Sequence, residues 1–419
     1  MRIRLTLVPI IALALTTACS SDRREAGAQT AARPVGSTSD SAGGTVAAVA
    51  GPGGVATVAA PGAITRLRNP NETPIVRALY VNRFAAQSTT KMKKLMAFVD
   101  TTELNGLVID MKDEFGLNYK SADPSVARNA GSGRGMVPNV KALLDTLHAH
   151  NILAIARIVT FKDPVAALVN PGWQIKTPAG ATWRDEKGNA WVNAYNKDVW
   201  EYNLKVAEEL TKLGFDEIQW DYIRFPEPYR RLGPQVFPGA NGMSKPDALA
   251  AFLKVAKERL NKLGVRSTAD VFGFVTTVRG PLEIGQHWEK LAPVTDVLLP
   301  MTYPSHYPRG TWGIPRPNAE PYKIMKIAID SARVRTKALG ITKPEAVRPW
   351  VQAFSLGQPK YDHTHVKAQI KAIYDAGFDG WILWHPGSNY DIFMPAIEKT
   401  LEARKKGTPA TASAPAAQE

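Results

Sequence analysis

The chain has 419 residues, of which 44% are hydrophobic, 21% charged and 8% aromatic. This composition is typical of a globular domain and excludes collagen-like, wholly disordered and polytopic membrane proteins. The formal net charge of +14 permits contact with anionic lipids or polymers, but the basic residues are scattered, so we expect no nucleic-acid partner.

The N-terminal segment is typical of a secretory signal. Two arginines precede an apolar run at 5–15, and small residues then lead to Cys19, the one cysteine of the sequence. The arrangement resembles a bacterial lipoprotein signal, which implies a signal peptide at 1–18 and lipidation of Cys19. Thr16 stands where such signals prefer Leu, and ordinary signal-peptidase cleavage is the alternative. We predict a cell-envelope protein, anchored to a membrane by lipid or secreted.

Two further segments lack the apolar residues of a folded core. Residues 19–72 consist mainly of Ala, Gly, Ser, Thr and Pro, and residues 403–419 have a similar composition. Such segments bury too little apolar surface to offset the entropy lost on ordering. We predict a flexible, lipidated linker at 19–72, a folded domain at 73–402 and a disordered tail.

Within the folded domain, runs rich in β-branched and aromatic residues alternate with helical patterns, as in parallel sheets. The predicted strands cover 75–84, 104–112, 152–161, 217–225, 266–274, 297–303, 349–354 and 380–385. The predicted helices cover 91–100, 140–150, 199–213, 246–263, 322–338 and 365–376. Eight strand units in one domain predict an α/β fold, the (β/α)8 TIM barrel. A doubly wound sheet is the alternative, but the turn after the first strand, beginning Asn82-Arg83-Phe84, is not glycine-rich.

The fourth predicted strand carries the strongest candidate for catalysis. Its sequence GFDEIQWDYIRFPEP places Gln219 and Asp221 on one face, and Arg224 follows. Active sites of TIM barrels lie where strands end. The alternative is that Asp221 forms a rim salt bridge with Arg224. We favour function, because an acid, an arginine and aromatic residues clustered at a strand exit are typical of a site.

The fifth predicted strand supplies a second acid, Asp270 in STADVFGF. If the barrel is correct, Asp270 and Asp221 face one cavity. Two carboxylates on neighbouring strand ends meet the requirement of glycoside hydrolysis, in which one protonates the departing oxygen and the other attacks the anomeric carbon or activates water. We therefore predict Asp221 and Asp270 as the catalytic pair. The alternative for Asp270 is a cap or turn acid.

The second and third predicted strands add polar candidates for substrate binding. Asp110 and Lys112 end the second strand, and Asp110 is suited to holding a sugar hydroxyl or to acting as a third acid. Asp113 is expected to face water in the following turn. Arg157 lies within an apolar run, where a guanidinium requires an anionic partner, so we expect it to orient Asp221 or Asp110. The alternative is an ordinary interstrand ion pair.

Aromatic residues near the strand ends suggest a carbohydrate platform. The long loop after the third strand contains Trp183 and Trp191, and exposed rings there would stack on the C–H faces of sugars. Packing of this loop onto the barrel is the alternative. Tyr303, Trp384 and His385 close the sixth and eighth strands and are predicted to form walls of a sugar site.

Other motifs predict no cofactor. His363 and His365 have the spacing of metal ligands, but they open a helix in which Asp362 is a candidate N-cap, so we expect no metal site. The GSGRG stretch at 131–135 does not follow a strand, which favours a loop over a phosphate site.

Several motifs together resemble the bacterial “putative glycosyl hydrolase domain” family, long described as a domain of unknown function. They are ALYVN, LVIDMKDEFG, IARIVTFKDP, WRDEKGNAWVNAY and, above all, GFDEIQWDYIRFP, and the resemblance extends over residues 75–399. It implies a TIM-barrel glycoside hydrolase of envelope or secreted proteins, and it implies the general activity more firmly than any substrate.

The strand that ends in Asp221 is also similar to the fourth strand of alpha-amylase-type and alpha-galactosidase-type barrels, which implies a nucleophile at Asp221. The fifth-strand acid of the amylase type is a glutamate, whereas this chain has Asp270. We predict a hydrolase of an envelope or extracellular glycan. A non-catalytic carbohydrate-binding lipoprotein on the same fold is the alternative, and an envelope scaffold for protein partners is a third hypothesis.

Overall fold

Eight parallel strands form the central barrel of the computed structural model, which describes residues 74–343 and 345–399, all within one compact unit of the chain. The barrel strands are β1 (Arg77–Val81), β2 (Gly106–Asp113), β4 (Leu153–Val159), β5 (Glu217–Asp221), β6 (Arg266–Phe272), β7 (Val297–Met301), β8 (Trp350–Gln352) and β9 (Trp381–Trp384). A ninth strand, β3 (Gly116–Leu117), forms an antiparallel hairpin with β2.

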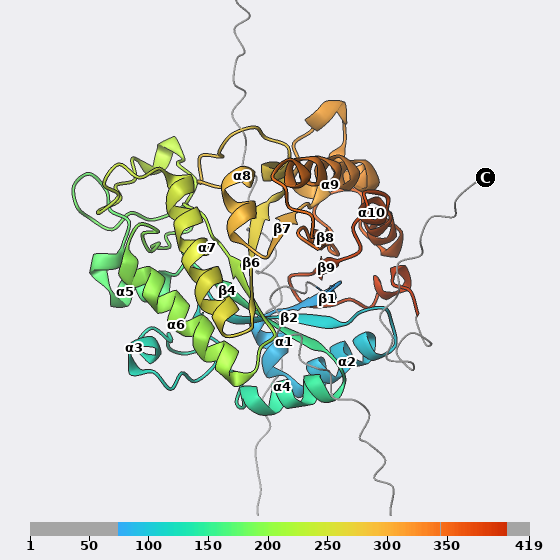
Figure 1. The fold of residues 1–419 in the computed structure, drawn as a ribbon, viewed down its shortest axis with the longest axis horizontal. Helices are drawn as coiled ribbons and strands as arrows, with labels where there is room; N and C mark the ends of the chain where they lie inside the picture. The colour runs from blue at the N-terminus through green and yellow to red at the C-terminus, as the bar shows by residue number, and fades with distance from the viewer. Residues whose placement is uncertain (1–73, 344, 400–419) are drawn as a thin grey trace, which may run out of the picture. The chain divides into compact units, whose positions relative to one another are not determined.

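The order of the strands closes the sheet on itself. Neighbours follow the order β1-β9-β8-β7-β6-β5-β4-β2-β3, and β1 also pairs with β2. Every pairing between neighbouring barrel strands is parallel. Figure 1 shows these strands in the middle of the described unit with the long helices outside them. The predicted (β/α)8 barrel is confirmed, and the doubly wound alternative is wrong because the β1–β2 pairing joins the two ends of the row of barrel strands and closes the sheet.

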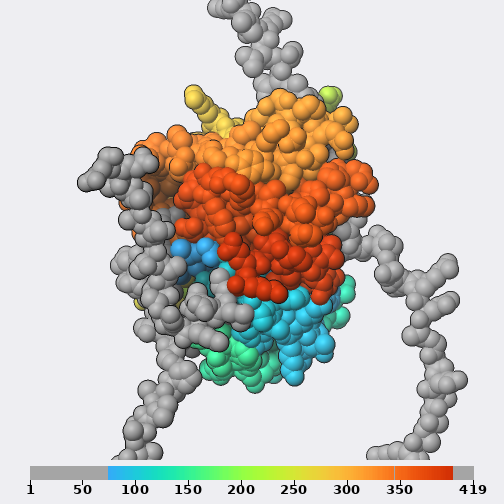
Figure 2. Space-filling model, turned by 90° about the vertical axis from the view of Figure 1, so that its right-hand side faces the viewer, coloured from blue at the N-terminus to red at the C-terminus, as the bar shows by residue number. Residues whose placement is uncertain are grey.

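Helices connect the strands and cover the outside of the barrel. In the described residues they are α1 (Arg83–Gln87), α2 (Thr89–Asp100), α3 (Pro124–Ala127), α4 (Val140–Ala149), α5 (Pro164–Val169), α6 (Lys197–Leu213), α7 (Lys245–Lys262), α8 (Trp288–Leu291), α9 (Pro321–Ala338) and α10 (His363–Asp375). Short 3-10 helices lie at Pro171–Trp173, Arg230–Leu232, Gly273–Thr276, Ala292–Val294, Pro304–His306, Thr311–Gly313, Pro317–Ala319 and Met394–Ala396. In Figure 2, α9 and α10 form much of the face in view.

Each of the six predicted helices has its counterpart in the structure, with ends that differ by no more than two residues. The first strand, by contrast, ends at Val81 and not at residue 84. The cause is Asn82, whose side chain accepts a hydrogen bond of 2.8 Å from the backbone N–H of Ala85 and caps α1. The short helix that follows carries Arg83 and Phe84 at the carboxyl end of β1.

Glycines set two of the helix-to-strand corners. Gly214 follows α6 with φ 121°, and Gly377 lies just beyond α10 with φ 81°. Both are in the left-handed region, where a side chain would be strained, and each turns the chain into the next strand. The sequence Gly-Phe-Asp follows both helices.

Alternation along the strands creates two hydrophobic layers. Leu107 and Ile109 of β2 belong to the large cluster beneath the helices, whereas Val108 between them belongs to a separate cluster. That second cluster, with Ile155 and Leu299, fills the inside of the barrel. Burying each such side chain contributes roughly 1.5–3 kcal/mol.

Several predictions concern residues that the structure does not describe: the signal at 1–18, Cys19, the linker at 19–72 and the tail at 403–419. Among the helices of the described residues, none combines the length and apolar character needed to cross a membrane.

A buried ionic cluster occupies the amino-terminal end of the barrel interior. Glu217, at the start of β5, accepts from Arg348 Nη1 at 2.7 Å, Arg266 Nε at 3.2 Å and Thr268 Oγ1 at 3.1 Å. All four residues are buried, with exposures of 0–1%. Burial alone would raise the pKa of Glu217, but the two guanidinium groups outweigh burial and hold this pKa below its ordinary value.

We expect Glu217→Gln to lower the free energy of unfolding by about 3–5 kcal/mol, because it leaves two buried guanidinium groups without their counter-charge. Urea denaturation measures the change. The control is Asp145→Asn on exposed α4, which should stay within about 0.5 kcal/mol. A loss below about 1 kcal/mol for Glu217→Gln would contradict the importance of this cluster.

Candidate active site

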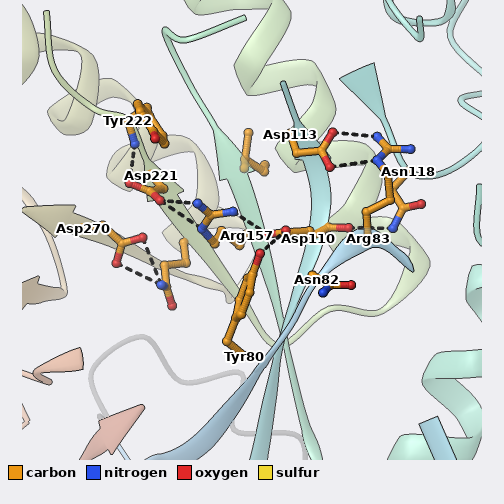
Figure 3. A network of polar contacts seen from close by, with 12 residues as sticks. Tyr80, Asn82, Arg83, Asp110, Asp113, Asn118, Arg157, Asp221, Tyr222 and Asp270 are labelled. Atoms are coloured by element: carbon orange, nitrogen blue, oxygen red, sulfur yellow. Dashed lines mark hydrogen bonds and ion pairs between the residues drawn. The ribbon is translucent and has the colours of Figure 1, made fainter. Parts of the chain in front are cut away.

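Three carboxylates and one guanidinium from neighbouring strands meet inside the barrel. Asp110 comes from β2, Arg157 from β4, Asp221 from the end of β5 and Asp270 from β6. Figure 3 shows these four side chains in a row, with Arg157 between Asp110 and Asp221. Their exposures are 4%, 9%, 6% and 1% in the same order. The structure thus brings together both predicted catalytic residues and two of the predicted binding residues.

Arg157 links two of the acids. Its Nη1 donates to Asp110 Oδ1 at 2.5 Å, its Nε donates to Asp221 Oδ2 at 3.0 Å, and its Nη2 also pairs with Asp221. Burial lowers the pKa of this guanidinium, but the carboxylates of Asp110 and Asp221 outweigh burial and raise the pKa well above its ordinary value. The expected pairing of Arg157 with Asp221 or Asp110 is confirmed, and it involves both.

The orientation of Asp221 is determined by backbone as well as by Arg157. Its Oδ1 accepts from the backbone N–H of Tyr222 at 2.5 Å. Tyr222 has φ 47°, a left-handed conformation that costs a residue with a side chain about 1–2 kcal/mol. Both carboxylate oxygens of Asp221 therefore accept hydrogen bonds, and the group has one orientation.

Asp270 lies deeper among N–H donors. Gln219 Nε2 donates to its two oxygens at 2.9 and 3.1 Å, and Trp350 Nε1 donates to Oδ1 at 2.7 Å. Burial, and then the nearby charge of Asp221, raise the pKa of Asp270 well above its ordinary value. Gln219 Oε1 is buried and has no hydrogen-bond partner among the described residues.

Asp110 forms a short contact with a residue that the sequence analysis missed. Tyr80 Oη donates to Asp110 Oδ2 at 2.5 Å. Burial, followed by the charge of Asp113, outweighs the opposing effect of Arg157 and raises the pKa of Asp110 to about 6. The signal that could have revealed Tyr80 is its place one residue before the end of the first barrel strand.

A second ion pair stands beside the first. Arg83 Nε and Nη2 donate to Asp113 Oδ2 and Oδ1 at 2.8 and 2.9 Å, a bidentate contact between side chains that are 1% and 5% exposed. Asn118 lies next to this pair, and its Nδ2 donates to the backbone oxygen of Asp110 at 2.8 Å. The expectation that Asp113 faces water is wrong, since the turn after β1 brings Arg83 onto it.

Aromatic rings form the other side of the site. The ring of Trp384 lies between those of Tyr80, with centroids 5.9 Å apart, and Tyr303, at 5.6 Å. Phe354 meets Trp384 edge-on at 5.0 Å. Burial, and then the charges of Asp270 and Asp221, raise the pKa of Tyr303 well above its ordinary value. Tyr303 and Trp384 therefore lie in the same group as the acids.

Lys112 does not join this group. A β-bulge between Asp110 and Lys112 shifts the register of β2 against β4, so Lys112 points out of the barrel. Its Nζ contacts Asp163 Oδ2 at 2.7 Å and Asn203 Oδ1 at 3.1 Å, and it is fully buried beside α6. The expectation that Lys112 binds substrate with Asp110 is wrong. It assumed that side chains alternate regularly between the two faces of β2, and the bulge interrupts this alternation.

Arg224 and the loop tryptophans also lie elsewhere. Arg224 pairs with Glu227 at 3.1 Å and lies 5.0 Å from the centre of the Trp191 ring, so the proposed rim salt bridge with Asp221 is wrong. Trp183 and Trp191 are each 1% exposed. The expected platform of exposed rings is therefore wrong, because the loop packs onto the barrel and buries both indoles.

His385 stabilises the loop after β9. Its Nδ1 accepts from the backbone N–H groups of Gly387 and Asn389 at 3.0 and 3.3 Å. Burial, together with the charge of Lys91, lowers the pKa of His385 to about 4, so the ring is neutral at physiological pH. None of these contacts joins His385 to the acids.

The predicted cap at Asp362 is confirmed, because its carboxylate accepts from the backbone N–H groups of Thr364 at 2.9 Å and His365 at 3.4 Å. Among the described residues, we find no group of three or more His, Cys, Asp or Glu side chains arranged to hold a metal ion.

With this geometry established, comparison with known proteins gives the family. The chain belongs to the family described as “Putative glycosyl hydrolase domain”, which matches residues 78–390. The resemblance expected from the sequence motifs is confirmed. A search of curated proteins found no match.

Solved structures with a similar fold include several glycan-acting proteins. The glycoside hydrolase domain of PgaB (BpsB) from Bordetella bronchiseptica has a TM-score of 0.53 at 12% identity, covering 75% of this chain and 95% of that one. A hypothetical protein from Ruminiclostridium thermocellum is 34% identical, covering 45% of this chain and 96% of that chain, with a TM-score of 0.41. Catalytic domain 2 of an Ostrinia furnacalis Group II chitinase has a TM-score of 0.46 at 11% identity, covering 80% and 98%. At its low identity, the Bordetella likeness shows the fold alone.

We expect the Asp110 carboxyl to titrate near pH 6, and carbon-detected NMR with Asp110→Asn as the assignment control measures the midpoint. Tyr80→Phe should raise this midpoint, because it removes a hydrogen bond to the carboxylate. The pKa of Asp110 is higher in the folded protein than in the unfolded chain, so protonation of this carboxyl favours folding. Its contribution to stability is complete below pH about 4 and is lost as the pH rises through about 6. A midpoint near 4 in the folded protein would contradict the burial argument.

Proposed function

We propose that this protein is a glycoside hydrolase that cleaves a glycosidic bond in a cell-envelope or extracellular polysaccharide. The observation that carries the proposal is that Asp221 and Asp270 lie on neighbouring strands inside one barrel and have different surroundings. Hydrolysis of a glycosidic bond requires one protonated and one ionised carboxyl group. Proteins reach this state by giving the two groups different surroundings, which shift their pKa values apart. Membership of the glycosyl hydrolase family supports the same reaction class.

In the proposed mechanism, Asp221 acts as the ionised carboxylate. Arg157 and the Tyr222 N–H hold its orientation, so that it attacks the anomeric carbon or takes a proton from the attacking water. Asp270 acts as the acid, since burial raises its pKa and so favours its protonated form, and it gives that proton to the departing oxygen. Trp384, the partly exposed ring of the aromatic side, contacts the sugar opposite the acids.

Asp110 is the alternative acid. It is 4% exposed against 1% for Asp270, and its pKa of about 6 lies nearer to the pH at which an acid catalyst works best. Tyr80, which donates to Asp110, would then stabilise the carboxylate that remains after Asp110 gives its proton to the departing oxygen. In either assignment Asp221 remains the ionised partner.

A second candidate function is carbohydrate binding without cleavage. It is favoured by one observation, that three N–H···O contacts engage both oxygens of Asp270 while its side chain is almost completely buried. A carboxyl satisfied in this way fits a packing role. The aromatic side of the site would still bind a glycan.

We expect Asp221→Asn to keep the fold with a lowered melting temperature, because Arg157 loses one of its two counter-charges, and to reduce glycan cleavage by at least about 100-fold when assayed well below that temperature. The assay counts new reducing ends released from bacterial envelope polysaccharides, with Asp145→Asn as a surface control. Parallel Asp270→Asn and Asp110→Asn variants identify the acid by which of them loses activity. Unchanged turnover in Asp221→Asn removes this residue from the mechanism, and glycan binding without cleavage in the parent chain favours the second function.

We also propose that Cys19 carries a lipid that anchors the mature chain to an envelope membrane. Support comes from the signal pattern at 1–18 and the linker composition at 19–72, which would let the barrel reach its polymer substrate.

We expect Cys19→Ser to move the protein from the membrane fraction to the soluble envelope or secreted fraction, because the acyl chain that buries in the bilayer is absent. Fractionation of cells that express each form, with immunodetection of the barrel, measures the change. A Cys19→Ser protein that stays in the membrane fraction argues against a lipid anchor.

A further inference from the structure

Two exposed phenylalanine rings lie together beside the site. Phe84 is 53% exposed and Phe115 is 36% exposed, and their centroids are 6.4 Å apart. Phe84 lies in α1, directly after β1, and Phe115 lies in the turn after β2. Because β1 and β2 are parallel neighbours, both rings stand at the carboxyl end of the barrel, where active sites of this fold lie.

The backbone that carries these rings is rigid. The bidentate Arg83–Asp113 pair joins the residue before Phe84 to the β2 turn. Arg83 Nη2 also donates to the backbone oxygen of Gly116 at 2.6 Å, and Phe115 N donates to Asp113 Oδ1 at 2.9 Å. A buried ion pair therefore positions two exposed apolar rings. Burying the pair costs desolvation free energy, and this cost suggests that the position of the rings serves a function.

The glycine-rich stretch at 131–135 completes the cluster. A Cβ at Gly131 would lie 2.4 Å from the backbone oxygen of Phe115, so only glycine permits this close approach. The backbone oxygen of Gly135 accepts from Arg83 Nη1 at 3.1 Å. The stretch thereby places the Arg134 guanidinium 4.6 Å from the centre of the Phe115 ring.

The cluster belongs to the same rim as the acids. Asp113 follows Asp110 by three positions in β2, which corresponds to at most about 10 Å along the strand. Figure 3 shows the Arg83–Asp113 pair beside the row of Asp110, Arg157 and Asp221. A single sugar ring does not extend over this separation, whereas a short oligosaccharide does.

We propose that Phe84, Phe115 and Arg134 form an outer subsite that binds a sugar ring of a glycan chain whose cleaved bond lies at the acids. The inference rests on the proposed function and adds that the protein binds longer oligosaccharides more tightly than disaccharides. Flat rings match the C–H face of a sugar, and a guanidinium donates hydrogen bonds to its hydroxyl groups. The rigid base lowers the entropic cost of binding, because the rings are already in position.

The test measures binding of a disaccharide and a hexasaccharide of β-linked N-acetylglucosamine by calorimetry, using the full chain in an Asp221→Asn background to prevent cleavage. We expect Phe115→Leu to weaken hexasaccharide binding roughly 2- to 10-fold and to leave disaccharide binding unchanged. Phe115→Tyr, which keeps a flat ring, should bind like the parent. Phe84→Leu should act as Phe115→Leu does, and Val334→Ala, an exposed site on α9, is the control.

The outcomes separate the two proposals. Hexasaccharide binding that is equal in the parent and both Leu variants overturns the outer subsite alone and leaves the hydrolase proposal intact. If the Leu variants bind both sugars more weakly by the same factor, the outer subsite is also overturned, because the substitutions would then affect binding at the acids themselves. If neither sugar binds to the parent chain or to any variant, the proposed function fails together with the inference.

Discussion

The site depends on one buried guanidinium. Arg157 is buried inside the barrel, and a charge there is stable only with counter-charges in contact. Asp110 and Asp221 supply them from the strands on either side. The same contacts orient Asp221. Arg157 therefore both stabilises the buried carboxylates and fixes the position of Asp221 in the site.

Charge inside the barrel is arranged by depth. The buried charged residues form a column along the barrel axis. At its amino-terminal end Glu217 pairs with Arg266 and Arg348, and in its middle Arg157 pairs with Asp110 and Asp221. The Arg83–Asp113 pair closes the column at the carboxyl end of β2. Asp270 differs from the other acids, since its contacts are neutral N–H donors and no cation touches it among the described residues. Burial, and then the charge of Asp221, raise the pKa of Asp270 well above its ordinary value.

The two halves of the barrel mouth have different chemistry. Strands β2, β4, β5 and β6 supply acids and Arg157, whereas the segments at and after β1, β7, β8 and β9 supply the rings of Tyr80, Tyr303, Phe354 and Trp384. A sugar has polar edges and apolar faces, so a site with one polar and one aromatic side is complementary to it. The division follows from the order of the strands around a closed barrel.

The sequence by itself determined the fold and the main acids. Strand alternation placed Asp221 and Gln219 on one face, and the run of helical patterns determined the barrel, because both depend on local periodicity. Only the tertiary structure decided that Trp350 reaches Asp270 across the barrel, that a bulge turns Lys112 away from Asp110, and that Trp183 and Trp191 are buried. These outcomes depend on closure, register and loop packing, which join residues far apart in the chain and leave no local pattern.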